Sequence, residues 1–98
     1  MPDPSFKFMF IDMTLWPMGP AIPFIVSSKN VEEACKEVNS MYTEPRTMRV
    51  YQMSEFDGPL NLLIMYETGK PLNEDFLQGW YERNAVDKPE RVRVRRAR

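Results

Sequence analysis

The chain has 98 residues, of which 43% are hydrophobic and 28% charged, and this composition predicts a single small globular domain. Its one cysteine, Cys35, excludes an internal disulfide, and the absence of histidine removes the side chain best suited to proton transfer near neutral pH. The sequence also lacks paired-cysteine metal spacing and a glycine-rich phosphate loop, so we expect no metal site, no cofactor and no enzymatic activity.

The N-terminal segment MPDPSFKFMF carries an early acidic residue, Asp3, and lacks the basic start and small-residue cleavage site of a secretory signal. The longest uncharged run, residues 13–28, contains three prolines and is too short and too broken to cross a bilayer as a helix. We therefore expect a cytoplasmic protein without a membrane partner.

The first half of the chain predicts two strands followed by a helix. Residues 6–16 (FKFMFIDMTLW) predict a long strand that is apolar on both faces, and residues 22–28 predict a second strand in which Pro23 favours an edge or a strand start. Asn30 is expected to N-cap a helix that ends before Pro45. Its apolar stripe, which makes Cys35 a small buried hydrophobe rather than a nucleophile, comprises Val31, Ala34, Cys35, Val38, Met41 and Tyr42.

The second half repeats this order. Residues 47–53 and 60–67 predict the third and fourth strands, joined by an Asp-Gly-Pro turn. Asn73 is expected to cap a second helix whose apolar stripe comprises Phe76, Leu77, Trp80 and Tyr81. The order ββαββα predicts an α+β fold, with a four-stranded antiparallel sheet and both helices on one face. We expect one α+β domain over residues 1–87 and an Arg-rich tail over residues 88–98.

Packing both helices on one face would leave the other face of the sheet partly apolar, which favours a homodimer or docking on a larger partner. The turn after the first strand offers a further apolar site. Trp16 and Met18 could anchor a partner there, or Trp16 could fold back and close one end of the core.

Asp12 interrupts the apolar first strand and needs a compensating group. Pairing with Arg46 or Arg49, or a solvated position at the sheet rim, would make it structural. The alternative is an acid that faces a ligand or a partner.

The C-terminal segment concentrates positive charge. Residues 88–98 carry six basic side chains and one acidic side chain (net +5), whereas the rest of the chain carries seven basic and 13 acidic side chains (net −6). The tail could contact nucleic acid or an acidic protein, fold back on the acidic body, form a short edge strand with Val92 and Val94 facing inward, or remain a disordered solubilising end. Its five arginines are Arg91, Arg93, Arg95, Arg96 and Arg98.

These features favour a non-catalytic protein-interaction module that docks through an apolar surface, with the arginine tail as an electrostatic clamp on an acidic partner. Small inhibitors, adaptors and virus-encoded accessory proteins have this profile. The expected partner-binding residues are Trp16, Met18 and the five tail arginines. The alternative is an RNA- or DNA-binding protein whose tail contacts phosphates, and the least favoured hypothesis is an enzyme that uses carboxylates such as Asp12.

Overall fold

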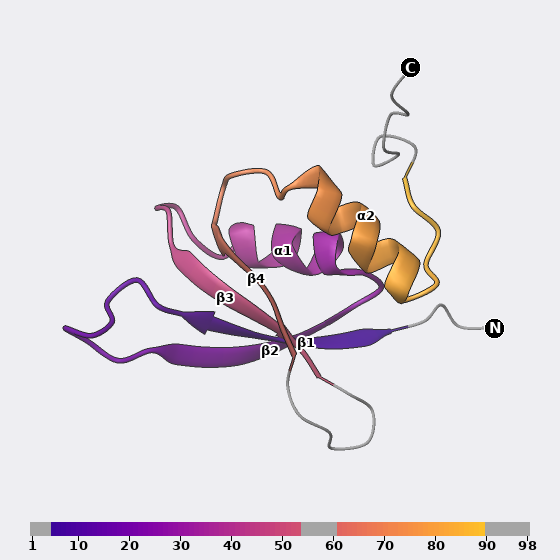
Figure 1. Ribbon diagram of the computed structural model, residues 1–98. Helices are drawn as coiled ribbons and strands as arrows, with labels where there is room; N and C mark the ends of the chain where they lie inside the picture. The colour runs from indigo at the N-terminus through magenta and orange to yellow at the C-terminus, as the bar shows by residue number, and fades with distance from the viewer. Residues whose placement is uncertain (1–4, 54–60, 90–98) are drawn as a thin grey trace.

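The computed structural model describes residues 5–53 and 61–89 (Figure 1). The elements follow the order β1 (Phe6–Asp12), β2 (Ile22–Ser28), α1 (Val31–Asn39), β3 (Thr47–Gln52), β4 (Asn61–Glu67) and α2 (Glu74–Arg83). The four strands form one antiparallel sheet in the order β2-β1-β3-β4, and both helices lie on the same side of it. The predicted α+β fold with ββαββα order is thereby confirmed.

Both helices begin at the predicted capping residues. The Glu33 backbone N–H donates to Asn30 Oδ1 (2.7 Å), and the Phe76 backbone N–H donates to Asn73 Oδ1 (3.0 Å). Each bond satisfies one of the backbone donors that a helix start leaves without an intrahelical partner.

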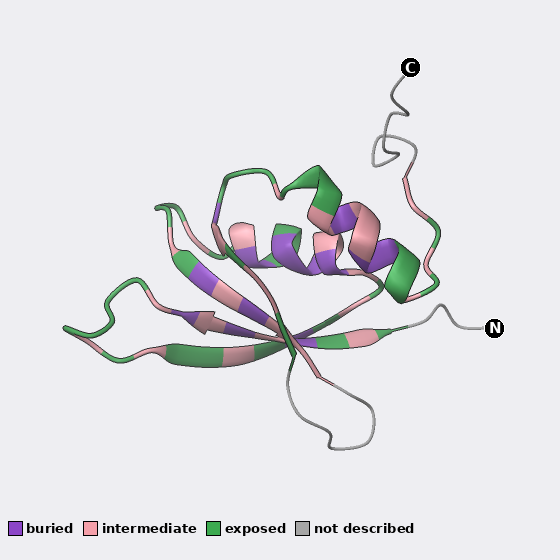
Figure 2. Ribbon diagram, viewed as in Figure 1, coloured by how far each residue is buried: buried purple, intermediate pink, exposed green. Residues whose placement is uncertain are grey.

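The core lies between the helices and one face of the sheet, as the buried segments in Figure 2 show. Alternation along β1 and β3 directs Phe8, Phe10, Met48 and Val50 toward the helices, where each is fully buried. The helices contribute the predicted stripes in large part: the buried residues are Val31, Ala34, Cys35, Val38, Leu77, Trp80 and Tyr81.

Two elements are shorter than predicted. Strand β1 ends at Asp12 rather than continuing to residue 16, because the Asp12 carboxylate accepts from Thr14 N (2.9 Å) and starts a turn. Helix α1 ends at Asn39, where Ser40 Oγ donates to Glu37 O (2.7 Å). The prediction that Met41 is buried on the α1 stripe is therefore wrong, and its side chain is 55% exposed.

Strand β2 is an edge strand, as Pro23 predicted. The predicted turn over residues 54–60 lies outside the described residues. So does the tail from residue 90 onward, and only Lys88 and Pro89 of the predicted tail segment are described.

Candidate functional site

The sheet face opposite the helices is apolar, and we call it the open face. Its composition follows from strand register, because directly opposed residues on neighbouring strands share a face. Two rows cross the four strands: Ile25, Met9, Tyr51 and Leu62 form one, and Pro23, Ile11, Arg49 and Met65 form the other.

The open face remains accessible where its outer strands run. Ile25 on β2 is 57% exposed, and Leu62 and Met65 on β4 are 53% and 52% exposed. In Figure 2, exposed segments mark β2, in contrast to the buried segments of β1 and β3 that lie under the helices. Four strands at about 4.8 Å spacing, with about six residues each, give this face an area of about 400 Å². An apolar patch that occupies much of such a face is often functional on a small protein.

Arg49 lies within the second row, between Ile11 on β1 and Met65 on β4. Its Nε atom is buried and has no hydrogen-bond partner. None of the salt bridges between described residues includes Arg49. Arg49 was not among the partner-binding residues predicted from the sequence. The sequence feature that could have indicated it is an arginine at an outward-facing position of an otherwise apolar strand.

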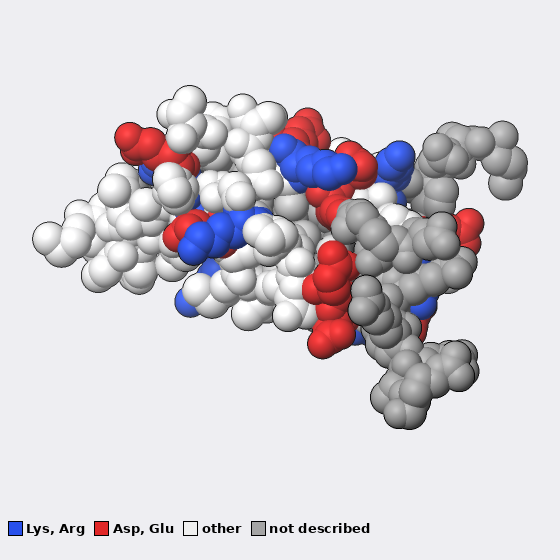
Figure 3. Space-filling model, turned by 90° about the horizontal axis from the view of Figure 1, so that it is seen from above, with Lys and Arg blue, Asp and Glu red and all other residues white. Residues whose placement is uncertain are grey.

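The β1–β2 hairpin tip is a second exposed apolar surface. Leu15 is 53% exposed, Trp16 is 59% exposed and Met18 is 95% exposed, while the Gly19 N–H donates to Leu15 O (2.6 Å) and closes the turn. The alternative in which Trp16 folds back on the core is therefore wrong. Residues 13–28 contain no charged side chain, and the tip forms the uncharged end at the left of Figure 3.

Asp12 forms one of the two ion pairs that the sequence predicted as structural. Its Oδ2 lies 3.5 Å from Arg46 Nη1, and its Oδ1 accepts from Thr14 Oγ1 at 2.6 Å. Of the two predicted partners, Arg49 cannot reach this carboxylate because Arg49 belongs to the open face, whereas Asp12 faces the helix side.

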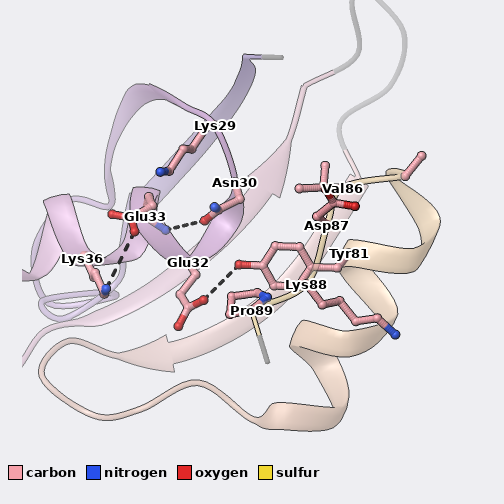
Figure 4. Close-up of a pocket in the computed structure, with 11 residues that line it drawn as sticks. Lys29, Asn30, Glu32, Glu33, Lys36, Tyr81, Val86, Asp87, Lys88 and Pro89 are labelled. Atoms are coloured by element: carbon pink, nitrogen blue, oxygen red, sulfur yellow. Dashed lines mark hydrogen bonds and ion pairs between the residues drawn. The ribbon is translucent and has the colours of Figure 1, made fainter. Parts of the chain in front are cut away.

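A cavity of about 640 Å³ lies between the start of α1 and the segment after α2 (Figure 4). Four of the polar groups in its lining pair with one another: Tyr81 Oη donates to Glu32 Oε1 (2.9 Å), and Lys36 Nζ lies 3.7 Å from Glu33 Oε1. Burial raises the pKa of Tyr81, and the negative charges of Glu33 and Glu74 raise it further. Pro89, the last residue that the structure describes, lines this cavity together with the acidic start of α1.

A smaller cavity of about 360 Å³ adjoins the α1–β4 contact. Burial raises the pKa of Cys35 to about 12, although a hydrogen bond with Tyr66 lowers it in part. A thiol with so high a pKa is a poor nucleophile, which agrees with the predicted role as a small hydrophobe.

Of the predicted partner-binding residues, Trp16 and Met18 lie together on the hairpin tip, and the five tail arginines lie outside the described residues. Among residues 5–53 and 61–89, no cluster of His, Cys, Asp or Glu side chains is suited to hold a metal ion. Neither helix of the described chain has the length and hydrophobicity needed to cross a membrane. Comparisons of the chain with protein-family models, with curated proteins and with solved structures found no match.

Proposed function

We propose that this chain is a non-catalytic protein-interaction domain that docks on its partner through the open face and the hairpin tip. The observation that carries the proposal is the pair of apolar rows across all four strands, with outer residues that are more than half exposed. If a partner buried the exposed surface of Ile25, Leu62 and Met65, each side chain would contribute about 1 kcal/mol to the free energy of binding.

The arginine tail supplies a second contact in this proposal. Its net charge of +5 would draw an acidic partner toward the domain and would add contacts that weaken as salt rises. A protein partner is favoured over nucleic acid because the two rows of the open face include a single aromatic side chain, Tyr51, and the body outside the tail carries a net charge of −6. Nucleic-acid platforms rely instead on several aromatic side chains in a basic groove.

A quantitative pulldown from a lysate of the source organism tests the proposal with the full chain as bait. The double variant Ile25→Gln/Leu62→Gln should capture at least about tenfold less of the specific partner than wild type does, because it places two polar side chains on the docking surface. Met41→Gln is the matched control, since Met41 is about equally exposed but lies in the segment between α1 and β3, outside the four strands.

Trp16→Ala and deletion of residues 89–98 separate the contributions of the tip and the tail. Trp16→Ala should reduce capture at every salt concentration, whereas the deletion should reduce capture mainly at low salt. Partner recovery that is unchanged in the double variant would contradict docking through the open face.

A further inference from the structure

Arg49 is the open-face residue with an unsatisfied polar group. Its neighbours across the sheet are Ile11 and Met65, so its stem lies among apolar side chains, and its Nε is buried without an acceptor. A guanidinium in such surroundings is stabilised by a carboxylate, which compensates the charge and offers two acceptor oxygens. On the described part of the face, alternation places one carboxylate, that of Glu67, and Glu67 forms no ion pair with Arg49.

Among the described residues, the other charged groups near Arg49 are either paired elsewhere or positively charged themselves. Arg46, three residues earlier, is paired with Asp12 and lies over the Tyr42 ring at 5.3 Å. Glu67 lies opposite Thr47 at the rim and is held by Lys70 at 3.1 Å. The other charged side chain that alternation places on this face is Lys7, which adds positive charge.

These charges also decide which occupant fits the face. A second copy would bring another Arg49 and another Lys7 against the first pair. The carboxylate on the described part of its face, Glu67, already pairs with its own Lys70. The area of about 400 Å² is also about half of what each partner contributes to a standard stable interface. A peptide-sized segment of another protein matches both the area and the charge.

On the basis of the proposed function, we infer that the partner segment on the open face is apolar and carries an acidic side chain that pairs with Arg49. Its aliphatic or aromatic residues cover the Ile25–Met9–Tyr51–Leu62 row. Its carboxylate receives the guanidinium in the adjacent row, where the surrounding apolar side chains exclude water and strengthen the pair.

The test uses the full chain as bait for a phage-displayed library of random linear peptides, selected in parallel on wild type, Arg49→Met and Ile25→Gln/Leu62→Gln. Peptides enriched on wild type should carry Asp or Glu between aliphatic or aromatic residues. Replacing that acid by its amide in the synthetic peptide should weaken binding to wild type at least about tenfold, but should hardly change binding to Arg49→Met.

Lys7→Met is the matched control, because it removes one positive charge from an exposed position of the same face and should change affinity less than about threefold. Circular dichroism and thermal unfolding of each variant establish that it is folded. Any of three results would overturn the inference. The enriched peptides carry no acid, they bind Arg49→Met as tightly as wild type, or no peptide is enriched.

Two further outcomes would assign a different occupant and would also overturn it. One is a concentration-dependent dimer in sedimentation that Ile25→Gln/Leu62→Gln abolishes, and the other is a single-stranded RNA oligonucleotide whose binding requires Arg49. If acidic peptides bind Ile25→Gln/Leu62→Gln as tightly as wild type, the proposed docking face fails. If binding requires the face but not Arg49, the inference about the acid fails and the proposed function stands.

Discussion

At the residue scale, Asp12 connects the end of β1 to the start of β3. Its side chain is 7% exposed, accepts hydrogen bonds from Thr14 N and Thr14 Oγ1, and pairs with the Arg46 guanidinium. Thr14 Oγ1 in turn accepts from Thr47 N at 3.0 Å, so the carboxylate orients a hydroxyl that binds the neighbouring strand. This network explains how an acid is retained in an otherwise apolar strand.

We expect Asp12→Ala to lower the free energy of unfolding by about 2–3 kcal/mol, because it leaves Arg46 and Thr14 without their acceptor. Asp12→Asn should lower the free energy of unfolding by a smaller amount, since its amide oxygen can still accept hydrogen bonds from Thr14. Urea denaturation at neutral pH measures both values. A loss below about 0.5 kcal/mol for Asp12→Ala would mean that water replaces the carboxylate at no cost.

The roles of individual residues differ in how far sequence can predict them. Asn30 and Asn73 were predicted as caps because a cap binds a backbone N–H three residues away, which is a local relation. Arg49 was not singled out as a partner-binding residue, because the burial of its Nε depends on Ile11 and Met65, and these become its neighbours only through strand pairing. The choice of Arg46 over Arg49 as the partner of Asp12 likewise required the register.

At the scale of elements, the hydrophobic pattern predicted where strands and helices occur better than where they end. The apolar residues up to Trp16 fit a continued strand, but the Asx-type bond from Thr14 N to Asp12 starts a turn that exposes Trp16 instead. The stripe of α1 continues through Met41 in the sequence, yet the cap at Ser40 ends the helix first. At the end of β1, a local polar bond overrides apolar periodicity.

Helix α2 is joined to the sheet by a ring of polar contacts at Gln52. Trp80 Nε1 donates to Gln52 Oε1 (2.9 Å), Gln52 Nε2 donates to Asn84 Oδ1 (3.0 Å), and Asn84 Nδ2 donates to Trp80 O (2.8 Å). The Trp80 ring also packs edge-on to Phe6, with centroids 5.2 Å apart. The Trp80 N–H is therefore satisfied by a residue at the end of β3.

Gln52→Ala should lower the free energy of unfolding by about 1–3 kcal/mol, because the buried indole N–H and the Asn84 amide both lose their partner. In the background Trp80→Phe, which has no indole N–H, the same substitution should cost measurably less. Thermal and urea unfolding of the four proteins completes the double-mutant cycle. Equal costs in both backgrounds would show that the indole bond does not contribute to stability.

At the scale of the molecule, the two faces of the sheet have different surroundings. The helix side carries acidic and basic side chains on its outer surface, as Figure 3 shows, and covers the buried core. The opposite side leaves the two apolar rows uncovered by helices. The sequence predicted this asymmetry from a strand apolar on both faces and two amphipathic helices, but it did not predict which residues would line the open side.

The core also makes the folded molecule sensitive to high pH. Burial raises the pKa of Cys35 from 9.0 to about 12, and burial, together with the neighbouring Cys35, raises the pKa of Tyr66 above its ordinary value. The pKa of Tyr81 shifts in the same direction. All three groups are therefore held in their neutral, protonated forms by the fold.

We expect the free energy of unfolding to be independent of these groups below about pH 8 and to fall as the pH rises above about 9, because the unfolded chain then loses protons that the folded chain retains. Cys35 alone should lower it by about 1 kcal/mol between pH 9 and pH 10. Urea denaturation over this range measures the slope, and Cys35→Ala should be flatter there even though its smaller side chain lowers stability at neutral pH. An equal slope in wild type and Cys35→Ala would mean that the thiol ionises as readily in the folded domain as in the unfolded chain, and that Cys35 is accessible to water.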